Sequence, residues 1–313
     1  MIKRSVKEQL HPRNRFRNGY DFPGLIACRP RLAQFVATNA YGDASVDYAD
    51  PEAVKALNQA LLQHAYAIES WDVPPGYLCP PIPGRSDYLH HLADLPGIGN
   101  APVPRRTPVV VLDIGMGANC IYPIIGAREY GWRFVGTEID PVALQWAKKL
   151  VAANPAVADL IECRLQRSPL ECFNGVIKAG ETFDLSMCNP PFHASAEAAA
   201  EGTRRKRRNL GHKKSATPVL NFGGQASELW CDGGELAFVR RMIVESAARP
   251  GLCRWFTTLV SKSTHLPRLF QSLQEVKALD VKTLEMTHGQ KKSRILAWTF
   301  TRAAGPTSAC PRS

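Results

Sequence analysis

The stretch PVVVLDIGMGANCIYPIIGAREYGWRFVGTEID, residues 108–140, decides the fold of this 313-residue chain. It begins with a short β-branched run that ends in a glycine turn, as a buried parallel strand does. A helix and a second strand, WRFVGTEID, follow directly. Strands and helices keep alternating after this stretch. Further strands are expected at 160–165, 182–188 and 254–261, and helices near 141–154, 234–248 and 266–273. A final antiparallel pair is expected from 276–286 and 293–300. This alternation predicts an α/β fold with a mostly parallel, seven-stranded sheet flanked by helices.

Upstream of this stretch the chain is helical and rich in proline. Residues 32–70 are predicted to be helical, with a start signal at Asp50 and Pro51, because aspartate caps a helix and proline fits its first turn. Five prolines in 73–84 predict a stiff connection, and a short helix is expected near 87–95. We therefore divide the chain into a basic N-terminal RNA-binding arm (1–40), a helical and proline-rich segment packing on the core (41–107), the core itself (108–302) with a basic loop (201–216), and a flexible tail (303–313).

The composition excludes several classes of protein. Apolar residues make up 45% of the chain, too many for a disordered protein. No apolar run approaches the ~20 residues of a membrane-spanning helix, and the basic N-terminus lacks the apolar stretch of a secretory signal. The nine cysteines are scattered and never spaced C-x-x-C, which argues against zinc and favours reduced thiols. We expect a soluble cytoplasmic protein without a metal site or a membrane partner.

Positive charge is concentrated in two segments. The net charge is +11, and residues 1–31 hold eight Lys and Arg against two acids. Residues 201–214, EGTRRKRRNLGHKK, hold seven against one. A near-neutral body with two basic segments indicates a polyanionic partner such as nucleic acid, although either run alone is equally consistent with a solvated loop.

Two motifs lie at neighbouring strand ends, where ligands bind in open α/β sheets. In Asp113-Ile114-Gly115-Met116-Gly117 the glycines let the backbone approach a ligand, and Asp113 can orient the turn or accept from a ligand ammonium. Such turns also occur for packing alone, and Cys120 replaces the third glycine of a dinucleotide fingerprint. Glu138 ends the next strand, where a carboxylate can accept both hydroxyls of a ribose. Together the two motifs predict a nucleoside site.

The most specific motif is Asn189-Pro190-Pro191-Phe192, directly after the strand TFDLSMC. The prolines lack N–H donors and hold the backbone extended, so nearby carbonyls remain available. The Asn189 side chain and the Pro190 carbonyl can both accept from an exocyclic amine, which exposes the lone pair of that nitrogen to attack. Phe192 offers a face on which a flipped base can stack. An ordinary turn between a strand and a loop is the alternative.

The ordered set D-I-G-M-G, E-I-D and N-P-P-F resembles the S-adenosylmethionine-dependent methyltransferases that modify exocyclic or amide nitrogens. A closer resemblance covers nearly the whole chain. The blocks HPRNRFRNGYDF, PPIPGRSDYLHHLADL, DIGMGANCIYPIIGA, MCNPPFH, RKRRNLG, NFGGQ-x3-ELWC-x-GGE and GQKKSRILAWTF are similar to those of the bacterial 23S ribosomal RNA adenine-N6 methyltransferases of the RlmF family. The resemblance implies the Rossmann-like class I methyltransferase fold, S-adenosylmethionine as cofactor, and 23S ribosomal RNA or the assembling large ribosomal subunit as partner.

The resemblance also assigns roles to positions of this chain. Arg85, in PPIPGR, matches an arginine that holds the cofactor carboxylate, and Gly115, Gly117 and Glu138 match the cofactor loop and the ribose acid. Asn189, Pro190, Pro191 and Phe192 match the catalytic motif, with Asn189 also facing the cofactor. A cofactor contact after the third strand belongs to the family but has no clear match in CRLQRSPLECFNG. The RNA is expected to contact basic residues of the two charged segments, namely Arg13, Arg15, Arg17, Arg204, Arg205, Lys206, Arg207, Arg208, Lys213 and Lys214.

Two other functions stay open at this point. N-P-P motifs also serve amide nitrogens, so the chain could be a glutamine-amide protein methyltransferase, although the basic segments and Phe192 argue against it. It could also be a non-catalytic ribosome-assembly factor that binds RNA. The presence of Asp113, Glu138 and Asn189 argues against this alternative. We expect a monomer.

Overall fold

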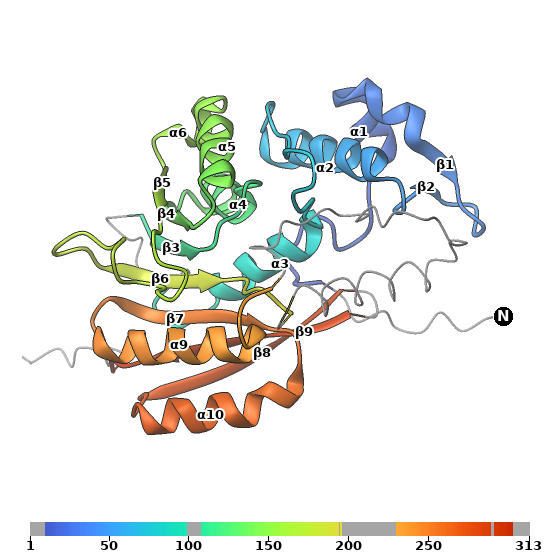
Figure 1. Cartoon of the computed structure of the whole chain (residues 1–313). Helices are drawn as coiled ribbons and strands as arrows, with labels where there is room; N and C mark the ends of the chain where they lie inside the picture. The colour runs from blue at the N-terminus through green and yellow to red at the C-terminus, as the bar shows by residue number, and fades with distance from the viewer. Residues whose placement is uncertain (1–9, 99–107, 194, 196–229, 289–290, 303–313) are drawn as a thin grey trace, which may run out of the picture.

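A seven-stranded sheet forms the centre of the fold. The computed structural model describes residues 10–98, 108–193, 195, 230–288 and 291–302. The sheet order is β5-β4-β3-β6-β7-β9-β8 (Figure 1). Its strands are β3 (Val110–Ile114), β4 (Arg133–Glu138), β5 (Ile161–Leu165), β6 (Phe183–Cys188), β7 (Cys253–Val260), β8 (Asp280–His288) and β9 (Lys291–Thr299).

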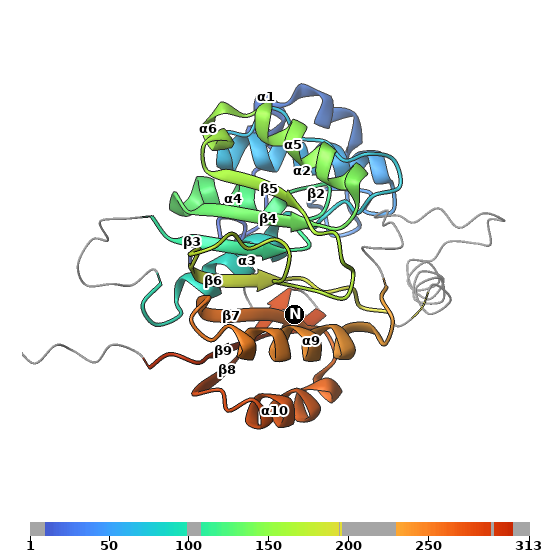
Figure 2. The ribbon, with the colours of Figure 1, turned by 60° about the vertical axis from the view of Figure 1, so that its left-hand side comes forward.

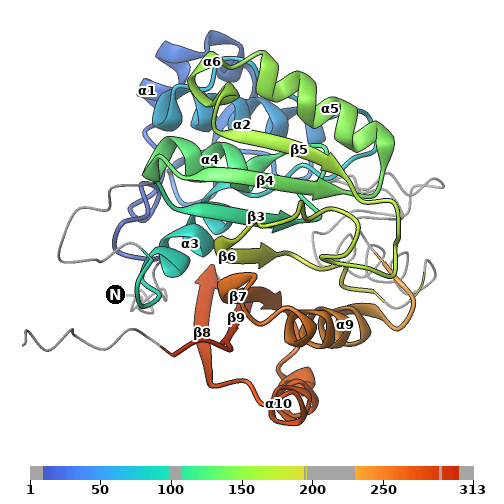
Figure 3. The ribbon, with the colours of Figure 1, turned by 90° about the vertical axis from the view of Figure 1, so that its left-hand side faces the viewer.

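The strands from β3 to β7 are parallel, and β9 runs antiparallel to both β7 and β8. The arrowheads of β3, β4, β5 and β6 accordingly point the same way in Figure 3. This arrangement confirms the predicted mostly parallel sheet with a final antiparallel pair. Because the parallel strands share a direction, their carboxyl ends meet at one edge of the sheet.

Helices cover both faces of the sheet. They are α4 (Ile121–Tyr130), α5 (Pro141–Ala152), α6 (Pro155–Ala158), α9 (Gly234–Ala248) and α10 (Leu266–Glu275), with a 3-10 turn η2 (Ser263–His265) before α10. Successive strand residues point to opposite faces, so Val111 packs in the apolar cluster that includes α4 and α5, whereas Leu112 packs in the one that includes α9 and α10. Figures 1 and 2 show α9 running alongside β7. The helix start at Asp140 is capped as its sequence indicates, with the side chain accepting from Val142 N at 2.8 Å.

The N-terminal third adds helices to the α4 side. Its elements are α1 (Phe22–Cys28), a 3-10 helix η1 (Pro30–Phe35), the hairpin strands β1 (Val36–Thr38) and β2 (Ala44–Val46), α2 (Pro51–Tyr66) and α3 (Ile82–Ala93). Asp50 caps α2 by accepting from Glu52 N at 2.9 Å, as predicted. The helical prediction for 32–70 was wrong over 36–49, because Asn39 closes the hairpin turn by accepting from the amides of Tyr41 and Asp43 at 2.9 and 3.0 Å.

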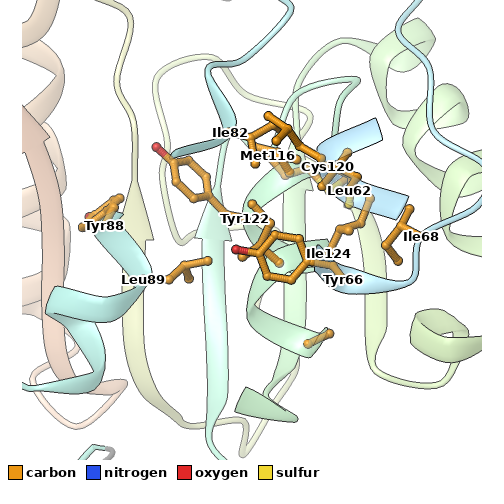
Figure 4. Packing of buried hydrophobic residues seen from close by; sticks show 14 of the residues in the cluster. Leu62, Tyr66, Ile68, Ile82, Tyr88, Leu89, Met116, Cys120, Tyr122 and Ile124 are labelled. Carbon is orange, nitrogen blue, oxygen red and sulfur yellow. The ribbon is translucent and has the colours of Figure 1, made fainter. Parts of the chain in front are cut away.

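Side chains of α2, α3 and α4 share one continuous core. Figure 4 shows this packing, with Leu62, Tyr66, Ile68, Ile82, Tyr88, Leu89, Met116, Cys120, Tyr122 and Ile124 labelled. Phe16, Phe22 and Leu25 are buried in the same cluster. Asp87 of α3 accepts from His11 N at 2.7 Å and from the Asn14 side chain at 3.0 Å. The part of the basic N-terminal segment that is described is therefore folded against the core. No helix within the described ranges is long and apolar enough to cross a membrane.

Candidate active site

The carboxyl ends of β3, β4 and β6 surround a cavity of about 370 Å³. The cavity is of the size that small-molecule ligands occupy. Seven of the residues singled out in the sequence line it, namely Arg85, Gly115, Gly117, Glu138, Asn189, Pro190 and Pro191. Asp113 is buried at the end of β3, and Phe192 is partly buried next to the lining prolines. The topology thus brings together motifs that are more than 100 residues apart in the sequence.

The glycine turn after β3 is fixed by its neighbour β4. The amides of Gly115 and Met116 both donate to the Thr137 carbonyl at 3.0 Å. Gly115 has a φ of +71°, and a Cβ at this position would meet no atom within 4 Å among the described residues. Glycine here adopts the left-handed backbone without strain and leaves the adjoining space to a ligand.

The Glu138 carboxylate is buried and held by backbone amides. Its Oε2 accepts from Gly117 N at 2.9 Å, and its Oε1 accepts from Ile139 N at 2.8 Å and Asp140 N at 3.0 Å. These bonds fix the orientation of the Glu138 carboxyl group on the cavity wall.

Asp113 carries a carboxyl group that is buried at the end of β3. It is 1% exposed, and among the described residues neither of its carboxylate oxygens accepts a hydrogen bond. Burial and, to a smaller extent, the nearby Glu138 charge raise the pKa of Asp113 to about 8, with Arg85 opposing the shift. A buried acceptor of this kind is costly to keep in a fold, and an incoming cationic group would satisfy it.

Arg85 faces the cavity from α3. Its Nη1 donates to the Tyr122 hydroxyl, and its guanidinium carbon lies 5.2 Å from the centre of the Tyr122 ring. Its buried Nε has no hydrogen-bond acceptor among the described residues. The helix begins at Ile82, earlier than the sequence predicts, which makes Arg85 a helical residue rather than part of a linker. The guanidinium is therefore positioned to bind an anionic group.

The Asn189 side-chain oxygen is buried on the cavity wall and has no donor among the described residues. The strand beneath it is fixed by a chain of hydroxyl groups. Thr257 Oγ1 donates to the Ser186 carbonyl at 2.8 Å, so the buried Tyr88 hydroxyl, 2.8 Å away, is the donor to Thr257. The asparagine thus follows a rigid strand and presents an unsatisfied acceptor to the cavity.

Sequence reasoning named no residue of one cavity wall, although the family resemblance implied a cofactor contact within CRLQRSPLECFNG, after the third strand. This wall comes from the connection after β5 and from the start of α9, and its residues are Gln166, Pro169, Leu170, Glu171, Cys172, Trp230, Cys231, Asp232, Phe238 and Arg241. The two segments meet only through tertiary packing, and the polar run after β5 carries no motif. Within the described ranges, no cluster of His, Cys, Asp and Glu side chains could hold a metal ion.

Two of the predicted RNA-binding arginines make ion pairs within the protein. Arg13 Nη2 lies 2.7 Å from Asp94 Oδ1, and Arg15 Nε lies 2.8 Å from Glu129 Oε2. Their side chains remain 39% and 48% exposed. Arg17 is also described and is exposed. The basic run Arg204, Arg205, Lys206, Arg207, Arg208, Lys213 and Lys214, the loop 201–216 as a whole and the tail 303–313 lie outside the described residues.

Known proteins share both the sequence and the fold. The family model Methyltransf_10, described as RNA methyltransferase, matches residues 4–302. Ribosomal RNA large subunit methyltransferase F of Serratia proteamaculans is 56% identical, with 94% of this chain and 88% of the relative covered. The same-named protein of Pectobacterium carotovorum is 56% identical, with 98% of each chain covered.

Two solved structures of human METTL16 are also similar. One is its catalytic domain in complex with MAT2A 3′UTR hairpin 1, at 31% identity and a TM-score of 0.77, covering 94% of this chain and 96% of that chain. The other is its N-terminal domain in complex with SAH, at 30% identity and a TM-score of 0.73, covering 94% and 99%. These matches confirm the Rossmann-like methyltransferase fold and the family resemblance carried by the sequence motifs. The chain therefore belongs to the Methyltransf_10 family of RNA methyltransferases, together with ribosomal RNA large subunit methyltransferase F.

Proposed function

We propose that the chain transfers a methyl group from S-adenosylmethionine to N6 of one adenine in 23S ribosomal RNA. The observation that carries this proposal is a cavity lined by Arg85 and by the Asn189 oxygen, with the buried Asp113 carboxyl beside it at the end of β3, where neither Asn189 Oδ1 nor the Asp113 carboxyl has a hydrogen-bond partner among the described residues. The named relatives act on large-subunit ribosomal RNA, and a solved relative was crystallised with SAH, the product left when S-adenosylmethionine gives up its methyl group.

The residues of the cavity fit this cofactor. Its amino-acid end carries an ammonium and a carboxylate, which the unpartnered Asp113 carboxyl and the Arg85 guanidinium would hold. Glu138 would accept from the ribose hydroxyls, and the turn at Gly115 and Gly117 would allow close approach of the backbone. When bound, S-adenosylmethionine supplies an electrophilic methyl group.

The N-P-P-F motif would prepare the nucleophile. The Asn189 side-chain oxygen and the Pro190 carbonyl would accept the two N–H bonds of the exocyclic amine, which draws the nitrogen towards tetrahedral geometry and directs its lone pair outwards. Pro191 keeps this turn extended, and Phe192 would stack on the flipped base. Positioning and polarisation of the amine would supply most of the rate.

The basic segments would hold the RNA backbone while the cavity reads the base. In the first segment we assign this role to Arg13, Arg15 and Arg17, whose exposed guanidinium groups can still reach phosphates. In the loop 201–216 we assign it to the run from Arg204 to Lys214. We propose that the chain works as a monomer and that it acts in the cytoplasm, where ribosomes are assembled.

Methyl transfer from labelled S-adenosylmethionine to deproteinised, unmodified 23S RNA tests the proposal. We expect the label in N6-methyladenine after digestion to nucleosides. Label in another nucleoside would contradict the assignment of the target atom. Label in glutamine of an added ribosomal protein fraction, with none in RNA, would instead favour the amide methyltransferase. Cofactor binding without transfer to RNA, ribosomal particles or protein would favour the non-catalytic factor.

A further inference from the structure

The connection between β5 and β6 closes one side of the cavity without forming a helix. Parallel strands are usually joined through a helix, whose backbone groups satisfy each other. Here residues 166–182 are irregular, yet they contribute Gln166, Pro169, Leu170, Glu171 and Cys172 to the cavity lining. The backbone amides of this connection therefore need partners from elsewhere in the fold.

One carboxylate supplies three of these partners. Glu245, on α9, accepts from Cys172 N at 2.8 Å through Oε1. Its Oε2 accepts from Phe173 N at 2.9 Å and from Asn174 N at 3.4 Å. The same connection is tied at its start by Gln166, whose side chain accepts from Ser168 N at 3.0 Å and donates to the Asn174 carbonyl at 2.9 Å.

The helix that carries Glu245 gives it a rigid base. Ser246, the next residue of α9, accepts from the Trp298 indole at 2.9 Å and donates to the Ile243 carbonyl at 2.7 Å. Phe238 and Arg241 precede Glu245 by seven and four residues, so the three side chains share one helix face. Phe238 and Arg241 line the cavity, whereas Glu245 lies further along the helix and binds the backbone of the β5–β6 connection, which completes the same wall.

We propose that Glu245 is a positioning residue that holds the β5–β6 connection in place and thereby sets the affinity of the cavity for the nucleoside part of S-adenosylmethionine. The inference rests on the proposed cofactor site. The Glu245 carboxylate accepts hydrogen bonds from three consecutive amides and so holds a segment that forms neither helix nor strand. Without them, the wall that contains Leu170 and Cys172 would sample other positions, and ligand binding would have to reorder it.

The test compares Glu245→Gln and Glu245→Ala with a control, Glu275→Gln, an exposed position on α10. Calorimetry measures the Kd of S-adenosylmethionine without RNA, and hydrogen exchange follows the amides of residues 172–174. We expect Glu245→Ala to weaken cofactor binding by about tenfold or more, as for loss of charged hydrogen bonds. Glu245→Gln keeps one acceptor oxygen, so we expect its Kd for S-adenosylmethionine to lie between those of Glu245→Ala and the wild type. We expect the Kd of the control variant to equal that of the wild type. Exchange should accelerate at residues 172–174 but not in β3 or β6.

Steady-state kinetics add a second readout. The KM for S-adenosylmethionine should rise, whereas kcat at saturating cofactor and the KM for RNA should change less than about threefold. An unchanged cofactor Kd in a folded Glu245→Gln, or equal losses in kcat and both KM values, would overturn the role of Glu245. Failure of the wild-type protein to bind S-adenosylmethionine would instead overturn the proposed function.

Discussion

Replacing Asp113 by asparagine should stabilise the protein measured without cofactor and remove its affinity for S-adenosylmethionine. The two carboxylate oxygens have no hydrogen-bond partner among the described residues, and the pKa of this buried group is raised to about 8. The folded protein therefore keeps Asp113 mostly protonated at pH 7, whereas the unfolded chain ionises it. Asparagine has nearly the same shape and no proton to bind.

The size of the effect follows from the pKa difference. Protonating a carboxyl group of ordinary pKa 3.8 at pH 7 requires about 4 kcal/mol, at about 1.4 kcal/mol per pH unit. The amide of asparagine is also unpartnered, which removes about 1–2 kcal/mol of the gain. We expect Asp113→Asn to raise the free energy of unfolding by about 2–3 kcal/mol at pH 7.

The sign of the pH dependence provides an independent check. Below about pH 4 both states of the wild-type protein are protonated, so Asp113 causes no pH dependence there. Between pH 4 and pH 8 the unfolded carboxyl group is ionised and the folded one is not, so the stability of the wild type falls relative to that of the variant. Urea unfolding at pH 5, 7 and 8 measures this difference. A variant less stable than the wild type at pH 7, or a difference independent of pH, would refute the reasoning.

Three further changes test other parts of the site. Phe192→Leu should weaken single-turnover methylation of RNA by about tenfold or more through lost stacking, and an unchanged rate would exclude Phe192 as the base platform. Tyr88→Phe removes the donor to Thr257 and should lower the free energy of unfolding by about 1–2 kcal/mol, checked by urea unfolding. Replacing Arg204, Arg205, Arg207 and Arg208 by glutamine should weaken RNA binding and flatten its dependence on salt, and a wild-type salt slope would show that the run does not contact phosphates.

The central part of the fold could be predicted because its signals are local. Each of the strands β3, β4 and β6 is a short apolar run bounded by a turn, and the residues after them reach the cavity by the rules of parallel sheets. The same reasoning placed Gly115, Glu138 and Asn189 on one cavity wall.

The remaining parts of the fold and of the site could not be predicted, because they depend on contacts between segments that are far apart in the sequence. The helical prediction over 32–70 included residues 36–46, where the side chain of Asn39 and the positive φ of Gly42 close a hairpin instead. The second cavity wall forms because Glu245 binds amides of residues more than 70 positions away. Arg13 and Arg15 were predicted as RNA contacts from charge and from the family resemblance, whereas their ion pairs to Asp94 and Glu129 depend on tertiary packing.

The most direct test of the account compares Asn189→Ala with the wild type on 23S RNA while the cofactor Kd is measured in parallel. If the Asn189 oxygen orients the adenine amine, the variant should bind S-adenosylmethionine within about threefold of the wild type and lose methyl transfer by about 10²-fold or more. Methyl transfer near the wild-type rate, with N6-methyladenine as product, would contradict the role assigned to this asparagine and to the cavity around it.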